Sequence, residues 1–231
     1  MPNIKEIFLS IQGEGPYIGY RQLFIRFCNC NLECDYCDTD FSVKDCNIEF
    51  EPGSGEFKRI RNPLEERDLT KIIRRFQDYH SISLTGGEPL LAYKFLQNFL
   101  PQLKSKIYLE TNGTLPEELG QIIDLVDIIS MDIKLPSSTG MKSFFKEHYD
   151  FIEIALRAKK EIFAKAVVTE KISRTEVDYL SQTAQKIPLI IQPVTSKDEK
   201  IILSREKLFQ ISEKIPEARI IPQTHNYLNI L

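Results

Sequence analysis

The sequence has no long hydrophobic run, no strong charge excess, and no repeated or low-complexity tract. None of its 231 residues falls in a stretch that approaches the ~18 apolar residues of a membrane-spanning helix. The N-terminus, Met1 to Glu6, lacks the basic and apolar regions of a signal peptide. The formal net charge of -3 gives no general reason to bind nucleic acid or an anionic membrane. We therefore expect a cytoplasmic protein with small or local partners and no direct nucleic-acid or membrane contact.

Cysteine and histidine are both scarce. Of the five cysteines, four lie between residues 28 and 37, and Cys46 stands apart. Disulfides between such near neighbours would stabilise the chain little, so metal chemistry is the better interpretation. The three histidines, His80, His148 and His225, can be ordinary surface residues.

The composition is that of a globular protein with a substantial core. Hydrophobic residues make up 42% of the chain and charged residues 27%, close to the usual balance. Because single α/β domains often reach ~200 to 250 residues, we expect one domain over residues 1–231.

Short β-branched or aromatic runs alternate with stretches of helical periodicity. This alternation predicts βαβ units and a parallel sheet, either open or closed into a barrel. Residues 41–63 have turn residues and little periodicity, and we expect an inserted hairpin or lid there. The expected strands are 22–27, 81–85, 106–110, 126–133, 162–168, 189–193 and 218–221, and the expected helices are 64–78, 90–103, 117–125, 141–157, 174–187 and 204–215.

Polar groups follow four of the expected strands directly. In parallel α/β folds the carboxyl ends of the strands carry the functional groups, so these groups should meet at one face. The four segments are TGGEP at 85–89, ETNGT at 110–114, DIK at 132–134 and QP at 192–193.

Cys30, Cys34 and Cys37 form a CxxxCxxC motif. Three thiolates can hold a 4Fe-4S cluster and leave one iron open, whereas such clusters usually take four cysteines. A structural zinc site is the alternative. It would need Cys28 as a fourth ligand, and Cys28 lies too close to Cys30 for the usual spacing. Cys28 and Cys46 are better explained as buried, inert thiols.

A CxxxCxxC motif followed by a strand ending in Gly-Gly-Glu-Pro resembles the radical S-adenosylmethionine (SAM) superfamily. The resemblance implies a partial β/α barrel with a small insertion after the cysteine loop. It also implies a 4Fe-4S cluster whose open iron binds SAM, with a 5'-deoxyadenosyl radical produced after one-electron reduction.

Further motifs resemble one family within it, the 7-carboxy-7-deazaguanine synthases of queuosine and deazapurine biosynthesis. These motifs are FLSIQGEG at 8–15, CDT at 37–39, ETNGT at 110–114 and PQTH at 222–225. The resemblance implies a lyase that converts 6-carboxy-5,6,7,8-tetrahydropterin to 7-carboxy-7-deazaguanine with loss of ammonia. Hydrogen abstraction from C6 needs no side chain as a general base, so no catalytic side chain is expected.

Each motif can be interpreted for that substrate. Polar groups near residues 12 to 14 can match a pterin edge, and the planar fork of Arg26 suits a carboxylate, although it could instead face solvent. Thr85 is a further contact or a strand-end cap, and the chain end either folds back onto the substrate or frays. The substrate residues implied are Ile11, Gln12, Gly13, Glu14, Arg26, Thr85 and Leu231.

The resemblance also implies magnesium on Thr39, beside the substrate carboxylate, although Thr39 could merely cap a turn. Magnesium keeps several waters, so one protein oxygen is chemically tolerable. Gly86 and Gly87 would permit close approach of the methionyl amino group, and Glu88 would accept a hydrogen bond from it. The implied SAM residues are Tyr36, Asp38, Gly86, Gly87, Glu88, Asn112, Ser130, Lys134 and Gln192.

The family implies a homodimer and an electron donor such as flavodoxin or ferredoxin. Two other functions remain open from the sequence. A glycyl-radical-enzyme activase shares the cysteine and Gly-Gly-Glu-Pro motifs but acts on a protein. A non-catalytic zinc-binding module would leave the polar strand ends unexplained.

Overall fold

The computed structural model describes residues 1–35, 43–195 and 200–228. Its strands are β1 (Ile4–Ile11), β2 (Arg21–Phe27), β3 (Asp45–Ile48), β4 (Lys58–Arg61), β5 (Ser81–Gly86), β6 (Ile107–Thr111), β7 (Ile128–Asp132), β8 (Glu161–Val168), β9 (Leu189–Pro193) and β10 (Arg219–Ile220). Its α-helices are α1 (Glu66–Ile73), α2 (Tyr93–Phe99), α3 (Pro116–Ile122), α4 (Pro136–Thr139), α5 (Phe145–Arg157), α6 (Arg174–Ala184), α7 (Arg205–Lys214) and α8 (His225–Leu228).

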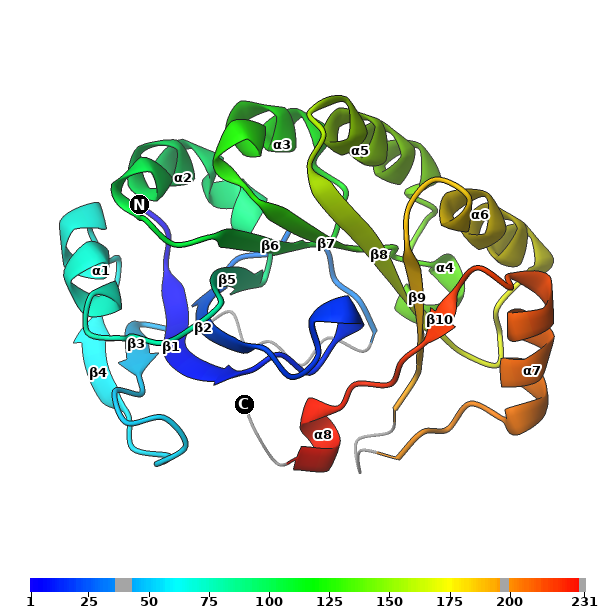
Figure 1. The fold of residues 1–231 in the computed structure, drawn as a ribbon, viewed down its shortest axis with the longest axis horizontal. Helices are drawn as coiled ribbons and strands as arrows, with labels where there is room; N and C mark the ends of the chain where they lie inside the picture. The colour runs from blue at the N-terminus through cyan, green and yellow to red at the C-terminus, as the bar shows by residue number, and fades with distance from the viewer. Residues whose placement is uncertain (36–42, 196–199, 229–231) are drawn as a thin grey trace.

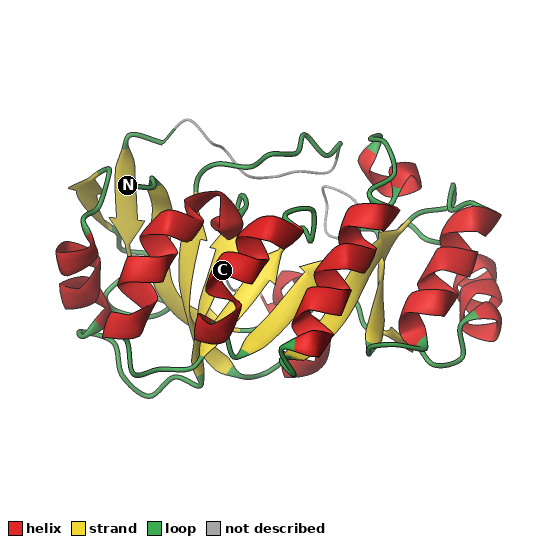
Figure 2. Ribbon diagram, turned by 90° about the horizontal axis from the view of Figure 1, so that it is seen from above, coloured by secondary structure: helices red, strands yellow, loops and turns green. Residues whose placement is uncertain are grey.

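The strands form one curved sheet in the order β10-β9-β8-β7-β6-β5-β2-β1-β3-β4. From β2 through β5 to β10 every neighbouring pair is parallel, and β1 joins β2 in antiparallel pairing. The two ends of this order do not pair, so the sheet is an arc with helices along its outer side (Figures 1 and 2). The predicted α/β fold, an incomplete β/α barrel, is confirmed.

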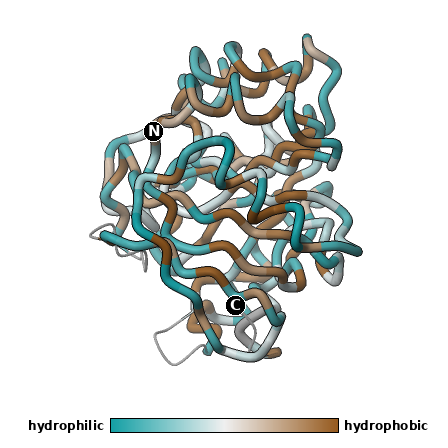
Figure 3. Tube along the Cα trace, turned by 90° about the vertical axis from the view of Figure 1, so that its left-hand side faces the viewer, coloured by the Kyte–Doolittle hydropathy of each residue, from teal (hydrophilic) through white to brown (hydrophobic). Residues whose placement is uncertain are grey.

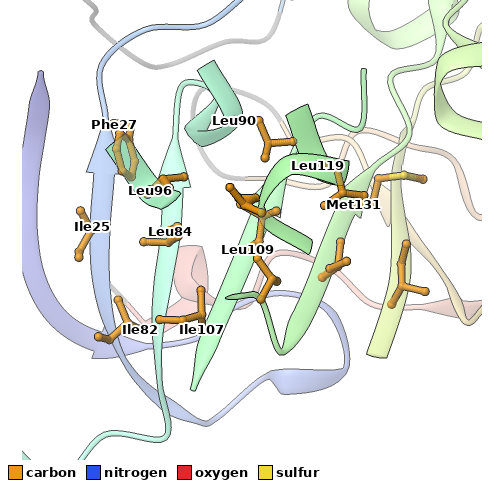
Figure 4. Close-up of a cluster of buried hydrophobic side chains, with 14 of the residues drawn as sticks. Ile25, Phe27, Ile82, Leu84, Leu90, Leu96, Ile107, Leu109, Leu119 and Met131 are labelled. Atoms are coloured by element: carbon orange, nitrogen blue, oxygen red, sulfur yellow. The ribbon is translucent and has the colours of Figure 1, made fainter. Parts of the chain in front are cut away.

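The outer face of the sheet is apolar because alternate residues of each strand point to the same side. Isoleucine and leucine from neighbouring strands pack there against leucines of the helical layer (Figure 4). Along the helices, hydrophobic and hydrophilic stretches alternate, as expected when one helical face covers a sheet (Figure 3). No helix among the described residues has the length and apolar character needed to cross a bilayer. The labelled core residues are Ile25, Phe27, Ile82, Leu84, Leu90, Leu96, Ile107, Leu109, Leu119 and Met131.

The inner face of the arc carries two layers of side chains. A buried apolar cluster forms the lower layer, with Tyr108, Ile128, Phe163 and Ile190 from four adjacent strands. Two residues further along the same strands, the side chains become polar: Glu110, Ser130, Lys165 and Gln192. The period of two places this polar layer on the same face, one step nearer the carboxyl ends of the strands.

The segment for which an inserted hairpin or lid is expected contains β3 and β4. They pair with each other in antiparallel fashion, and β3 pairs in parallel with β1. The hairpin therefore extends the sheet at its edge. Cys46 in β3 and Cys28 after β2 are both fully buried, and burial raises the pKa of the Cys46 thiol to about 12.

Most predicted elements contain an observed one, with some differences in extent. The helix expected over 141–157 begins at Phe145, and the strand expected over 218–221 has only two residues. β1 was not predicted from the sequence, although the FLSIQGEG motif that was singled out starts within this strand. The boundary of α6 follows its sequence closely, because Ser173 and Glu176 form a reciprocal capping box at its start.

Candidate functional site

The loop after β2 brings two of the three predicted cluster ligands to the carboxyl edge of the sheet. Cys30 and Cys34 are both partly buried. The Cys30 sulfur accepts hydrogen bonds from Leu32 N at 3.4 Å and from Asn112 Nδ2 at 3.8 Å. Four further predicted site residues lie outside the described residues: the cluster ligand Cys37, the SAM contacts Tyr36 and Asp38, and the magnesium ligand Thr39.

The residues present fit a thiolate-bound cluster. Burial raises the pKa of the Cys30 thiol, and the two hydrogen bonds act in the opposite direction by stabilising the thiolate. N–H donors directed at cysteine sulfur are typical of cluster ligands. The described residues alone contain no group of three His, Cys, Asp or Glu side chains suited to a metal ion.

Gly86 and Gly87 allow the end of β5 to pack against the backbone of the cysteine loop. Gly87 N donates to Phe27 O at 2.9 Å, and Glu88 N donates to Asn29 O at 2.6 Å. A Cβ atom on Gly87 would lie 2.1 Å from Asn29 O, and one on Gly86 would lie 2.4 Å from Phe27 O. The two glycines are therefore needed for the protein's own packing, and their predicted approach to SAM stays a prediction.

Glu88 connects the ends of β5 and β6 from a buried position. Its carboxylate accepts hydrogen bonds from Leu90 N at 3.0 Å, Thr111 Oγ1 at 2.9 Å and Asn112 N at 2.7 Å. Burial raises the pKa of Glu88 to about 7 despite these three donors. The structure thus shows Glu88 orienting the loop after β6, and its contact with SAM stays a prediction.

His148 supports the same loop from α5. On sequence alone His148 could be a surface residue, but in the structure it is fully buried. Its Nε2 lies 3.1 Å from Asn112 O, a carbonyl acceptor, so Nε2 carries the proton. Burial lowers the pKa of His148 to about 4, and the ring is neutral at pH 7.

The predicted substrate loop after β1 is held by hydrogen bonds within the chain. Gln12 is buried, and its amide donates to Gln22 Oε1 at 3.0 Å and to Glu110 Oε1 at 2.7 Å. Its oxygen accepts from Glu14 N at 2.9 Å. The Gln12 amide therefore shapes the loop. Ile11, at its start, is 39% exposed.

The C-terminal segment folds back onto this loop. Thr224 donates to Gly13 O through both N at 2.8 Å and Oγ1 at 3.0 Å, and Gln223 Nε2 donates to Glu14 Oε1 at 2.6 Å. Figure 1 shows α8 on the open, inner side of the arc. The C-terminal segment therefore runs toward the predicted substrate loop. The predicted substrate contact Leu231 lies outside the described residues and stays a prediction.

Arg26 and Thr85 lie side by side on neighbouring strands. Thr85 Oγ1 donates to Glu110 Oε2 at 2.9 Å, and Arg26 Nε contacts Glu6 Oε1 at 2.6 Å. The Arg26 side chain is 28% exposed, so it is neither freely solvated nor buried. Its position at the carboxyl end of β2 places a cation beside the polar inner layer.

Two predicted SAM residues lie in that polar inner layer. Ser130 and Gln192 are both buried. Gln192 Nε2 has no hydrogen-bond partner among the described residues. Buried polar atoms are nearly always paired, so an orphaned amide beside the strand ends fits a site that a polar ligand completes.

Lys165 was not singled out from the sequence, and Glu110 and Asp132 were named only as part of the polar strand ends, without an assigned role. Glu110 receives the hydrogen bonds of Gln12 and Thr85, and Lys165 forms ion pairs with Glu14 and Asp132. The available signal for Lys165 was a lone lysine within the apolar run of β8. Asp132 also contacts the predicted SAM residue Lys134 at 3.0 Å.

Comparisons with known proteins show what this chain is similar to. A family model, the Radical SAM superfamily, matches residues 24–177. The 7-carboxy-7-deazaguanine synthase of Geobacter sulfurreducens is 40% identical, with 99% of this chain and 97% of the relative covered. The synthase of Methanocaldococcus jannaschii is 35% identical, with 99% and 100% covered. A crystal structure of QueE from Escherichia coli covers 97% of this chain and 94% of its own, at TM-score 0.60 and 20% identity, and supports the fold alone.

Proposed function

Because the chain belongs to the 7-carboxy-7-deazaguanine synthase family of radical SAM enzymes, we propose that it contracts 6-carboxy-5,6,7,8-tetrahydropterin to 7-carboxy-7-deazaguanine with loss of ammonia. The observation that carries this proposal is the 40% identity to a synthase over 99% of the chain. The comparisons favour neither a glycyl-radical-enzyme activase nor a zinc-binding module. The product would enter queuosine or other deazapurine synthesis, and so a tRNA modification pathway.

The 4Fe-4S cluster and SAM of this superfamily supply the radical that starts the reaction. Cys30, Cys34 and Cys37 would hold the cluster, with Asn112 Nδ2 donating to the Cys30 sulfur. For SAM we propose the set predicted from the sequence: Tyr36, Asp38, Gly86, Gly87, Glu88, Asn112, Ser130, Lys134 and Gln192. The Gln192 amide, which has no hydrogen-bond partner in the part of the chain that the structure describes, supports this assignment.

For the pterin we propose the polar inner layer and the loop above it. Glu14 would accept hydrogen bonds from the amine-bearing edge of the ring, and Arg26 would bind the carboxylate. The remaining contacts proposed are Ile11, Gln12, Gly13, Thr85 and Leu231. Burial of polar groups at such a site makes an analogue without the matching group a poor ligand, because the protein group is left unpaired.

Arg26 offers a clear test, because lysine keeps its charge but lacks its planar fork. Arg26→Ala is expected to raise the KM for the pterin about 10- to 100-fold, which corresponds to a lost charged hydrogen bond of about 1.5–3 kcal/mol. Arg26→Lys should recover only part of the loss. Reductive cleavage of SAM by dithionite is the control and should persist in both variants. An unchanged KM in Arg26→Ala would contradict the assignment.

Magnesium bound by Thr39 beside the substrate carboxylate is part of the proposal. Enzyme passed over a chelating resin should form product several-fold more slowly, and added Mg²⁺ should restore the rate, because the metal would position the carboxylate. Thr39→Ala should require more Mg²⁺, whereas Thr39→Ser keeps the hydroxyl and should behave like the wild type. Equal rates with and without Mg²⁺ would remove the metal from the proposal.

We also propose a homodimer and an external donor of single electrons, such as flavodoxin or ferredoxin. Analytical ultracentrifugation tests the first, and replacement of dithionite by reduced flavodoxin tests the second.

The central experiment is anaerobic reconstitution with iron and sulfide, followed by incubation with SAM, reductant and carboxytetrahydropterin. Mass spectrometry should show a ring-contracted product together with 5'-deoxyadenosine. SAM cleavage without conversion of the pterin would keep the superfamily and overturn the proposed substrate. Such a result would favour the alternative function, a glycyl-radical-enzyme activase.

A further inference from the structure

Lys165 is a buried cation at the centre of the polar inner layer. It lies in the middle of β8, two residues beyond the buried Phe163, and its side chain is 3% exposed. Burying an ammonium group is costly unless the charge is paired. An apolar residue of similar size would fill this position at lower cost, so the charge itself needs an explanation.

The charge of Lys165 is divided between two carboxylates from different parts of the chain. Its Nζ contacts Glu14 Oε2 in the loop after β1 and lies 3.4 Å from Asp132 Oδ1 at the end of β7. Burial alone would lower the pKa of Lys165, but the charges of Asp132, Glu14 and Glu110 outweigh burial and raise it. The lysine is therefore charged at neutral pH.

Glu14 is held from two sides. Lys165 contacts Oε2, and Gln223 Nε2 donates to Oε1 at 2.6 Å from the C-terminal segment. Two donors on the two oxygens fix the plane of the carboxylate. The backbone of the loop is held independently, through Gln12 and Thr224. Lys165 is thus placed to control the orientation of the Glu14 side chain more than the course of the loop.

Removal of the Lys165 charge would leave like charges facing each other. Glu14, Asp132 and Glu110 all contribute to the field at Lys165. Without the cation, repulsion would turn the Glu14 carboxylate away from the layer. Asp132 would keep Lys134, at 3.0 Å, as a partner. The effect should therefore fall mainly on Glu14.

We propose that Lys165 is a positioning residue that orients Glu14 toward the ring N–H and the exocyclic amine at the pyrimidine edge of the substrate. Through Glu14, Lys165 would determine the preference of the enzyme for ligands that carry this edge. The inference rests on the proposed function, since it names the residue that prepares the substrate contact. Lys165 touches Glu14 and is not assigned a contact with the ligand.

The test measures binding to the reconstituted enzyme with SAM, so that it does not depend on turnover. The probe is 6-carboxypterin, a fluorescent aromatic ligand with the same pyrimidine edge and carboxylate. Its 2-desamino analogue lacks the exocyclic amine. The variants are Lys165→Met, Lys165→Arg, Glu14→Gln and the double variant Lys165→Met/Glu14→Gln.

Lys165→Met is expected to weaken 6-carboxypterin binding about 10- to 100-fold, because Glu14 turns away and its charged hydrogen bond to the ligand is lost. Its preference for the amine-bearing ligand should fall about tenfold, and Lys165→Arg should recover most of it. The double variant should bind no worse than Glu14→Gln, because both changes remove the same contact between Glu14 and the ligand. Iron content and dithionite-driven SAM cleavage should stay at wild-type levels.

Additive losses in the double variant would show that Lys165 acts independently of Glu14 and would overturn the proposal. Unchanged ligand preference in Lys165→Met would also overturn it. Should Lys165→Met fail to fold, Gln223→Ala removes a second donor to Glu14 and must show a smaller loss of the same preference. A wild-type enzyme that binds 6-carboxypterin selectively but forms no product would refute the proposed reaction and leave this inference standing.

Discussion

Cys34→Ala is expected to abolish cluster binding and all product formation. The CxxxCxxC motif supplies three ligands, and loss of one leaves two thiolates for a group that needs at least three from the protein. Cys30 and Cys34 come from one loop at the carboxyl edge of the sheet, and Cys37 follows two residues after the described part of that loop. Iron and sulfide analysis, together with the visible absorbance of the reconstituted protein, measures the loss.

Two matched variants make this result specific. Cys46→Ala removes a buried thiol in β3, away from the motif, and should keep full iron content. Cys28→Ala removes the residue that a four-cysteine zinc site would need, and it should also keep iron and activity. Cys34→Ala with wild-type iron would contradict the ligand assignment. Iron loss in Cys28→Ala would favour a four-ligand site.

The parallel core could be predicted from the sequence because its strands are buried on both sides. Such strands leave a local pattern that can be recognised in the sequence. Runs such as 81–85 and 189–193 are short, β-branched and followed by turn or helix signals. β1 and the hairpin of β3 and β4 were harder to predict, because the pairing of strands at the sheet edge depends on partners far along the chain. Periodicity reports which face is buried and says little about which strand is the neighbour.

The site was predictable where chemistry requires a particular residue at a particular spacing. The cysteines and the Gly-Gly-Glu-Pro segment meet at one edge, as expected. Lys165 and His148 were not predictable, since a single lysine or histidine has no spacing signal. Their importance comes from burial and from partners that tertiary packing brings together, such as Glu14 and the carbonyl of Asn112.

The glycine pair shows how a sequence motif can have a cause that only the structure reveals. The sequence suggested that Gly86 and Gly87 make room for SAM. The structure shows that the space is already used by the backbone that leads into the cysteine loop, with Phe27 O and Asn29 O at the positions that a Cβ atom on Gly86 and Gly87 would need. The motif therefore couples the end of β5 to the position of the cluster ligands.

Gly87→Ala should consequently act on the cluster. A Cβ atom at 2.1 Å from Asn29 O is far inside van der Waals contact, so either the loop or the end of β5 must move. Overpacking of this kind typically costs about 1–3 kcal/mol and displaces backbone. Because Asn29 immediately precedes Cys30, we expect iron content and SAM cleavage to fall at least tenfold, with the 6-carboxypterin site affected less.

Gly120→Ala is the matched control for this substitution. Gly120 lies in α3, is exposed, and has no atom within 4 Å of an added Cβ. Alanine in a helix should stabilise the fold by about 0.4–1 kcal/mol through a lower entropy of the unfolded chain, and the cluster should be unaffected. Thermal melting and iron analysis of both variants separate a general cost of the methyl group from the close contact at Gly87. Full cluster content in Gly87→Ala would mean that the cysteine loop adapts to the added methyl group, and it would contradict the coupling between β5 and the cluster ligands.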